Sequence, residues 1–242
     1  MVNLQTEETN NKSDVPFIGK SMARIRSLHP WLHKTWPPLN GQRFRQTLFR
    51  SLIRELQPQA VFESGTHRGT TTEFLWNVSG CPVWTVEKDS RLARQAARKF
   101  REVPDIRVVK SDSRRALREL RGTSSFPRSR VLFYLDAHWD ADLPLREEVD
   151  IITSSWTNSV IVIDDFKVPD DPGYGFDVYG RTELSIKYVG DAITPYQVFW
   201  PECPSHQETG ARRGCVLLAA PEAAPYVAGL PEVRGVPESV AT

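Results

Sequence analysis

The sequence predicts an α/β protein, a Rossmann-like three-layer sandwich whose mostly parallel seven-stranded sheet ends in an antiparallel strand pair. Short apolar runs alternate five times with helix-like stretches between residues 60 and 163 of the 242-residue chain. The apolar runs contain no alternating polar residues, as is required of parallel strands that helices cover on both faces. Two more strand-like runs follow a long loop, and their short connection makes them antiparallel.

Each expected strand is a short apolar run that ends at a polar residue. The expected strands are residues 60–62, 82–86, 106–109, 131–135, 160–163, 196–200 and 214–218. The expected helices are residues 41–57, 72–78, 91–101, 113–120 and 143–152. The first helix has apolar residues at helical spacing and ends before Pro58. Asp89 or Ser90 is expected to cap the third helix, because both side chains accept backbone hydrogen bonds.

The length fits a single α/β domain, which we place at residues 41–220. Residues 1–40 are expected to form a mobile N-terminal arm or a lid. Their first half is polar, whereas Trp31 and Trp36 in their second half would need to pack against something. Residues 221–242 are rich in Pro, Ala and Val, and we expect a C-terminal tail that covers part of the surface.

The composition is that of an ordinary globular protein, with 40% apolar and 25% charged residues. No apolar stretch approaches the roughly 20 residues that cross a bilayer, so no membrane partner is expected. The polar N-terminus lacks the pattern of a secretory signal, and three scattered cysteines fit a reducing compartment, which together predict a cytoplasmic protein. A net charge of +1 argues against a nucleic-acid partner. Whether the chain forms a homo-oligomer is left open.

The first strand-to-helix turn, residues 63–70 with the sequence ESGTHRGT, is the first candidate for a ligand site. Ligands of open α/β sheets bind beyond the carboxyl ends of the strands, where the strand order reverses. Gly65 would let the backbone approach a ligand, and Gly69 would let the helix begin close to the strand. The spacing ExGxxxG lacks one glycine of the pyrophosphate-binding GxGxxG loop, which argues for a ligand without phosphates.

Acidic residues follow the next two strands. Glu87 ends the second strand, roughly 20 residues after the glycine turn, where a carboxylate accepts both hydroxyls of a ribose. Ser111 and Asp112 follow the third strand, where they would meet an adenine amine. A glycine turn can also be purely structural, and an acid after a strand is often a helix cap. Their coincidence at three successive strand ends favours a nucleoside-containing ligand.

These residues resemble the class I S-adenosylmethionine-dependent methyltransferases. Glu63-x-Gly65-x-x-x-Gly69 is similar to their first motif, Glu87 to their ribose-binding acid, and Asp112 to their adenine-side acid. The resemblance covers residues 58–220, including the final antiparallel pair that separates this fold from the dehydrogenases. It implies S-adenosylmethionine as the cofactor. The implied cofactor-binding residues are Glu63, Gly65, Thr66, Gly69, Thr70, Glu87, Ser111, Asp112 and Asp136.

Three carboxylates follow the fourth and fifth strands: Asp136, Asp164 and Asp165. They would repel one another without a compensating cation, and Mg²⁺ prefers such oxygen ligands. A bound Mg²⁺ would hold an acceptor diol and lower the pKa of one hydroxyl, whose proton His138 would take. We therefore expect all three aspartates to be metal ligands, and His138 and Asp136 to be catalytic. Alternatively, Asp164 or Asp165 caps a turn and His138 is structural.

This layout resembles the metal-dependent O-methyltransferases of the macrocin O-methyltransferase type, which act on sugar or phenol hydroxyls of natural products. They have one aspartate after strand four and an Asp-Asp pair after strand five. The run 136–139, DAHW, differs from their usual Asp-x-Asp-x-Tyr. The resemblance implies a small-molecule acceptor with hydroxyl groups, and Arg212 or Arg213 would pair with an anionic one. An N-methyltransferase and a catalytically inactive cofactor-binding scaffold are the alternatives.

Overall fold

The structure, a computed structural model, describes residues 37–137 and 142–235. The chain divides into two units, residues 1–34 and 35–242, of which the first lies outside the described residues. The expected N-terminal arm or lid therefore falls almost entirely outside them and stays a prediction. Within the described part of the chain, no helix has the length and apolar character that crossing a membrane would need.

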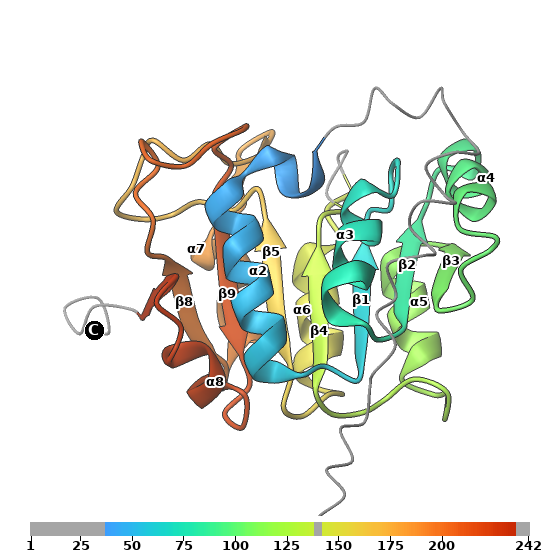
Figure 1. Ribbon diagram of the computed structural model, residues 1–242. Helices are drawn as coiled ribbons and strands as arrows, with labels where there is room; N and C mark the ends of the chain where they lie inside the picture. Colours follow the sequence, from blue (N-terminus) through green and yellow to red (C-terminus); the bar gives the residue numbers. More distant parts are fainter. Residues whose placement is uncertain (1–36, 138–141, 236–242) are drawn as a thin grey trace, which may run out of the picture. The chain divides into compact units, whose positions relative to one another are not determined.

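The second unit is built on an eight-stranded sheet with the order β10-β8-β9-β5-β4-β1-β2-β3 (Figure 1). The strands are β1 (Ala60–Ser64), β2 (Val83–Glu87), β3 (Ile106–Lys110), β4 (Val131–Leu135), β5 (Val160–Asp164), β8 (Gln197–Pro201), β9 (Cys215–Ala219) and β10 (Val233–Gly235). The first five are parallel to one another, and β9, β8 and β10 each pair antiparallel with their neighbours. The predicted Rossmann-like sandwich and its antiparallel pair are confirmed.

Helices cover the sheet between the strands, and in Figure 1 the helices α2 and α3 lie in front of it and α6 behind. The helices are α2 (Arg43–Leu56), α3 (Thr70–Ser79), α4 (Ser90–Lys99), α5 (Ser113–Leu120), α6 (Leu145–Thr153), α7 (Ile186–Val189) and α8 (Ala224–Ala228). Two 3-10 turns, η2 (Pro38–Gly41) and η3 (Gly190–Ile193), and a small hairpin of β6 (Val178–Tyr179) and β7 (Thr182–Glu183) complete the described residues.

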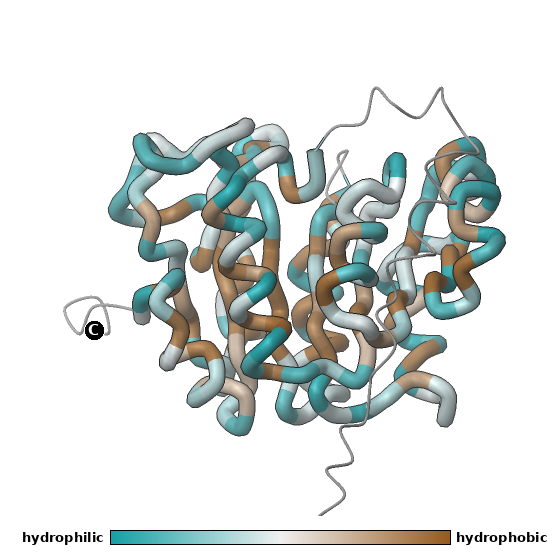
Figure 2. Tube along the Cα trace, viewed as in Figure 1, coloured by the Kyte–Doolittle hydropathy of each residue, from teal (hydrophilic) through white to brown (hydrophobic). Residues whose placement is uncertain are grey.

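The core lies on both faces of the sheet. Every residue of β1, β2, β4, β5 and β9 is buried, and Figure 2 shows these strands as largely apolar segments. An aromatic cluster fills the space at the base of β4, where Phe126 and Trp156 meet edge to face at 5.9 Å between ring centroids. The unbroken apolar runs that predicted these strands follow from this burial on two sides.

The C-terminal segment departs from the prediction. Instead of a surface tail, residues 221–235 contain the helix α8, which buries Ala224 and Val227, and the strand β10, which pairs with β8. The sheet therefore has eight strands and not seven. The added strand has three residues and only Val233 is buried, so the sequence shows neither a long apolar run nor an alternation at this point.

The parallel strands end together at one edge of the sheet, where the loops that follow them lie. The strand order reverses at β1, which lies between β2 and β4. A crevice is expected at such a reversal because the connections on the two sides leave in opposite directions. The turn after β1, the first candidate ligand site, lies at this point.

Candidate functional site

The turn between β1 and α3 requires its two glycines for packing. Gly65 has φ of +91°, and a Cβ atom there would lie 2.4 Å from the backbone carbonyl oxygen of Asp136. Gly69 has φ of +67°, and a Cβ atom there would lie 2.6 Å from the ring of Phe100. The close neighbour of Gly69 is therefore the residue that follows α4, a contact that the sequence did not suggest. Gly65 keeps the turn against the loop after β4.

Glu63 supports this turn from the buried side. Its Oε2 atom accepts hydrogen bonds from the hydroxyl groups of Thr72 and Thr85, and Thr85 also shares a 2.6 Å hydrogen bond with Thr66. Burial raises the pKa of Glu63 to about 7. The Oε1 atom has no hydrogen-bond partner among the described residues. Glu63 and Thr66 thus form a buried network that holds the first motif in place.

Glu87 is fixed at the end of β2 by the backbone. Its Oε2 accepts from the N–H of His67 at 2.8 Å, and its Oε1 accepts from the N–H of Asp89 at 2.9 Å. Asp89 in turn caps α4 by accepting from two backbone N–H groups, which confirms one of the two predicted caps. Both carboxylate oxygens of Glu87 are therefore held in position, with lone pairs left for a ligand.

Asp112 caps a helix and also lines a cavity. It caps α5 by accepting from the N–H groups of Arg114 and Arg115, and it pairs with the Arg114 side chain at 2.7 Å. The Arg114 guanidinium lowers the pKa of the Asp112 carboxyl below its usual value. Asp112 also lines the cavity described next, together with Ser111. The carboxylate is therefore a helix cap that faces a ligand-sized space.

A cavity of about 490 Å³ lies at the carboxyl ends of β1, β2 and β3. Its walls include the backbone of Gly65, the apolar side chains of Val86 and Leu92, and the polar groups of Glu87, Ser111 and Asp112. Small-molecule sites are concave, mostly apolar and roughly 300–1,000 Å³ in volume, with a few polar groups that orient the ligand. This cavity, which we name the nucleoside cavity after the ligand that the sequence predicts, brings together four of the predicted cofactor-binding residues.

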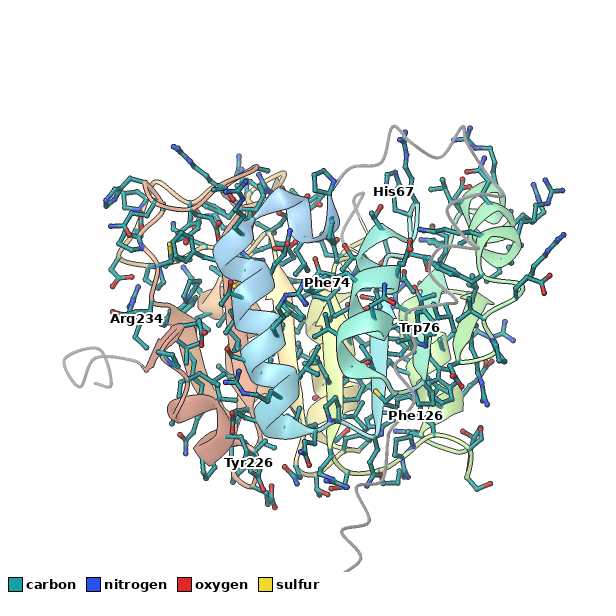
Figure 3. The ribbon with its side chains drawn as sticks, viewed as in Figure 1. His67, Phe74, Trp76, Phe126, Tyr226 and Arg234 are labelled. Carbon is teal, nitrogen blue, oxygen red and sulfur yellow. The ribbon has the colours of Figure 1, made fainter. Side chains whose placement is uncertain are left out.

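A second cavity of about 440 Å³ lies on the other side of the turn, and we name it the acceptor cavity after the methyl acceptor that the sequence predicts. Its walls include Thr66, Thr70, Asp136, Asp165, Asn40 and Arg213. Gly65 and His67 line both cavities, so the two spaces meet at the turn after β1. Figure 3 shows His67 at this edge of the sheet, beyond the end of β1. Among the predicted cofactor-binding residues, Glu63 and Gly69 line neither cavity.

The carboxylate of Asp164 is already engaged by an arginine. Asp164 is completely buried, its Oδ1 pairs with Arg45 Nη1, and its Oδ2 accepts from the hydroxyl of Tyr134 at 2.7 Å. The amide of Asn40 donates to the same Oδ2 at 3.1 Å. Arg45 comes from the first turn of α2 and is 2% exposed. Asp164 thus has a donor on each oxygen and lines neither of the two cavities.

The carboxylate of Asp165 is engaged by a second arginine. Arg213 Nε donates to Asp165 Oδ1 at 2.5 Å, and Arg213 Nη2 pairs with Asp177. Burial, followed by the charge of Asp164, raises the pKa of Asp165 to about 7. Two carboxylates of the chain, Asp165 and Asp177, therefore already surround the Arg213 guanidinium. An anionic acceptor, which the sequence predicts as a partner of Arg212 or Arg213, would have to compete with them for Arg213.

Asp136 lines the acceptor cavity, next to the turn after β1. Its Oδ2 accepts from the Tyr134 hydroxyl at 3.4 Å, and burial, followed by the charges of Asp164 and Asp165, raises its pKa well above the usual value. Among the described residues, no group of three or more His, Cys, Asp or Glu side chains is arranged to hold a metal ion. His138 lies outside the described residues, so its expected role as a base stays a prediction.

The expectation that the three carboxylates lack compensating cations is wrong for Asp164 and Asp165. Arg45 and Arg213 supply the positive charge at the end of β5. The sequence does contain a signal for the role of Arg45. Arg45 lies three positions before Leu48 and four before Phe49, so it is on the apolar face of α2. An arginine on a buried face requires an acidic partner.

No protein-family model and no curated protein matches the chain. Among solved structures, it is similar to an O-methyltransferase from Bacillus cereus in complex with S-adenosylhomocysteine, with a TM-score of 0.56 and 14% identity over 86% of this chain and 93% of that one. It is also similar to the O-methyltransferase TomG from Streptomyces achromogenes in complex with S-adenosylmethionine, with a TM-score of 0.53 and 15% identity over 86% and 91%.

A putative caffeoyl-CoA O-methyltransferase from Staphylococcus aureus gives a TM-score of 0.52 and 14% identity over 84% of this chain and 96% of that one. At these identities the likeness shows the fold. The chain therefore has the Rossmann-like α/β fold that these methyltransferases share, over nearly their whole length.

Proposed function

We propose that the chain is an S-adenosylmethionine-dependent methyltransferase that transfers a methyl group to a hydroxyl oxygen of a small molecule. The observation that carries the proposal is the nucleoside cavity, which lies at the strand-order reversal and has the Glu87 carboxylate in its wall. Solved structures with the same fold include O-methyltransferases in complex with S-adenosylhomocysteine or S-adenosylmethionine. Sugars and phenols are the acceptor classes that we expect.

The residues of the nucleoside cavity fit this cofactor. Glu87 presents two fixed carboxylate oxygens to the hydroxyl groups of a ribose. Val86 and Leu92 offer an apolar wall to a base, and Ser111 and Asp112 offer polar groups to its edge. The cofactor would supply a sulfonium methyl group. Because the two cavities meet at Gly65, that group would lie where the acceptor cavity begins.

The acceptor would occupy the second cavity with its hydroxyl directed at the turn. In the transfer, the acceptor oxygen bonds to the methyl carbon while the carbon–sulfur bond breaks, and the hydroxyl proton passes to a base. We assign this base to Asp136 or His138, of which Asp136 lines the acceptor cavity. A general base must lie within hydrogen-bond distance of the proton that it accepts. The magnesium-assisted form of the reaction does not fit, because Asp164 and Asp165 already bind arginines.

The first test is calorimetric titration of the full chain with S-adenosylhomocysteine. We expect binding by the wild type and a loss of about 10- to 100-fold in Glu87→Gln, because hydrogen bonds to a charged group contribute about 1.5–3 kcal/mol. Glu102→Gln is the matched control, since Glu102 is exposed and pairs only with the neighbouring Arg101 among the described residues. No binding by the wild type would contradict the proposal.

The second test separates the proposal from its alternatives. The wild type is incubated with methyl-labelled cofactor and a panel of sugars, phenols and amines, and the products are identified. Label on oxygen supports the proposal, whereas label on nitrogen would make the chain an N-methyltransferase. Binding of S-adenosylhomocysteine without transfer to any compound in the panel or in cell extract favours the catalytically inactive scaffold.

A further inference from the structure

We propose that Arg45 and Arg213 take the electrostatic role of a divalent cation at the end of β5, so that methyl transfer at this site needs no metal ion. The catalytic half of this inference, that methyl transfer needs no metal ion, rests on the proposed function. Its structural half, that a divalent cation does not bind these carboxylates, stands on the contacts alone.

Hydrogen-bond donors of the chain occupy both oxygens of Asp164. Arg45 Nη1 pairs with Asp164 Oδ1, and Arg45 Nη2 donates to the carbonyl oxygen of Arg213 at 2.5 Å. The other oxygen of Asp164 accepts from Tyr134 and Asn40. A divalent cation would have to displace these donors and also place its own charge beside a buried guanidinium. Arginine remains protonated in proteins, so raising the pH would not free the carboxylate.

The Glu208 carboxylate holds the backbone of Arg45 in this position. At the beginning of α2, the Glu208 carboxylate accepts from the backbone N–H of Phe44 at 3.2 Å and of Arg45 at 3.1 Å. An acidic group at this end of a helix is favourable because the first N–H groups have no partner within the helix. The arginine is therefore a fixed part of the site and does not depend on a ligand for its orientation.

Arg213 belongs to the same assembly. The Gln42 side chain donates to the Arg213 carbonyl oxygen at 2.9 Å and accepts from its N–H at 2.8 Å. Arg45 donates to the same carbonyl oxygen. The guanidinium of Arg213 then binds Asp165 and Asp177, whose backbones are joined by a hydrogen bond of 2.9 Å. These contacts connect the start of α2, the end of β5 and the segment before β9. We name Arg45 and Arg213, together with the carboxylates that they bind, the arginine pair.

The arginine pair reaches the acceptor cavity through its outer members. Asp165 and Arg213 both line that cavity, whereas Arg45 and Asp164 lie behind them. The unit can therefore fix the position of the Asp165 carboxylate at the cavity wall. In this arrangement, Arg45 and Arg213 are positioning residues, and the acceptor meets an aspartate that is neutralised by a guanidinium.

The structural half is tested by titrating the full wild-type chain with Mn²⁺ alone and measuring free Mn²⁺ by electron paramagnetic resonance. We expect no saturable binding that depends on Asp165 or Asp164. Saturable binding that Asp165→Asn or Asp164→Asn weakens or abolishes would overturn the proposal. Binding that both variants leave unchanged lies elsewhere on the chain and agrees with it, as does the absence of binding.

A gain-of-function variant tests the role of the guanidinium directly. Arg213→Gln leaves Asp165 and Asp177 side by side without their common cation, so we expect Mn²⁺ to raise its Tm relative to EDTA. The wild type and Arg212→Gln should show no such rise, because Arg212 is exposed and donates to the carbonyl oxygen of Glu208. A variant that folds and shows no response to Mn²⁺ would contradict the role given to Arg213. If it does not fold, the wild-type titration decides.

The catalytic half is tested by methyl transfer in Mg²⁺ and in excess EDTA, with S-adenosylhomocysteine binding measured in both. Equal rates support the proposal, and a rate that EDTA abolishes and Mg²⁺ restores would overturn it. Failure of S-adenosylhomocysteine to bind in either buffer would instead remove the proposed function. The Mn²⁺ titration would then still decide whether the arginine pair excludes a divalent cation.

Discussion

The guanidinium of Arg45 is buried against the carboxylate of Asp164, and the exposed fractions of the two side chains are 2% and 0%. Removing both charges from water is costly, and their attraction offsets this cost only when hydrogen bonds satisfy the remaining polar atoms. Here Tyr134 and Asn40 donate to Asp164, and Arg45 donates to a backbone carbonyl oxygen. The pair thus connects the beginning of α2 to the ends of β4 and β5.

Arg45→Met is expected to lower the free energy of unfolding by about 3–5 kcal/mol. Breaking one partner of a buried ion pair leaves an uncompensated charge, and measured losses for such changes lie in this range. Methionine keeps the apolar stem of the side chain, so the loss reports the removal of the guanidinium group. Urea unfolding followed by circular dichroism gives the value.

Arg54→Met is the matched control on the same helix. Arg54 is 68% exposed and pairs with its neighbour Glu55, so its removal should change the free energy of unfolding by less than about 0.5 kcal/mol. The double variant Arg45→Met/Asp164→Asn should recover part of the loss, because the orphaned charge is removed. Equal losses of unfolding free energy in the two methionine variants would show that the buried Arg45–Asp164 pair contributes no more to stability than an exposed pair.

Gly65→Ala tests the close approach between the turn and the loop after β4. A Cβ atom at position 65 would lie 2.4 Å from the carbonyl oxygen of Asp136, so the turn must move away. We expect a loss of stability of about 2–4 kcal/mol, from the positive φ and from overpacking, and a weaker affinity for S-adenosylhomocysteine. Urea unfolding and calorimetric titration measure the two effects.

Gly80→Ala separates these two contributions. Gly80 also has a positive φ, at +63°, but a Cβ atom there would have no neighbour within 4 Å. It should lose about 1–2 kcal/mol from the backbone conformation alone and keep the affinity of the wild type. If both alanine variants lose the same stability and neither changes the affinity, the contact with Asp136 does not determine the site.

Most of the fold could be predicted because its strands are buried on two sides. Residues such as Val131–Leu135 and Val160–Asp164 form unbroken apolar runs, and the helix 113–120 begins with a capping aspartate and has the predicted bounds. The strand β10 could not be predicted, because its pairing with β8 is decided by backbone hydrogen bonds at an edge that only the folded sheet provides. Local sequence carries little information on such a contact.

The part of the candidate site that follows from the order of the strands could be predicted from the sequence. Gly65, Glu87 and Asp112 follow successive strands, so their convergence on one cavity follows from the order of the sheet. The charges at β5 were not predictable in this way. Arg45 and Asp164 are far apart in the chain, and their pairing depends on the rotation of α2 about its axis. The sequence showed three acids, and the cations that neutralise them came from two distant segments.

Lys99→Met should loosen the turn between β1 and α3, which Lys99 contacts from the end of α4. Lys99 Nζ donates to the carbonyl oxygen of Gly69 at 2.8 Å and pairs with Glu73 at 3.0 Å, and its side chain is only 8% exposed. We expect a loss of about 1–3 kcal/mol in the free energy of unfolding, because these are hydrogen bonds of a charged donor. The adjacent Arg98→Met is the control, since Arg98 is exposed. Indistinguishable unfolding curves for the two variants would contradict the assignment.

Glu148 introduces a pH dependence into the stability of the fold. Its side chain on α6 is fully buried, and neither carboxylate oxygen has a hydrogen-bond partner of normal geometry among the described residues. Burial raises its pKa from 4.5 to about 7. Between these two pH values the folded state therefore binds more protons than the unfolded state, and this group makes the protein less stable as the pH rises through that window.

Glu148→Gln should remove this contribution, because glutamine resembles the protonated carboxyl group and does not titrate. The stability of the variant relative to the wild type should rise between about pH 5 and pH 8, by at most about 3 kcal/mol for a shift of this size. Urea unfolding across this range measures the difference, which cancels other buried carboxyl groups such as Glu63 that are present in both proteins. Glu102→Gln, at an exposed position, should show a difference that does not change with pH. A stability difference between Glu148→Gln and the wild type that stays constant with pH would contradict the prediction. It would mean that Glu148 is ionised in the folded protein at neutral pH, because a neighbour such as Arg114 stabilises its charge.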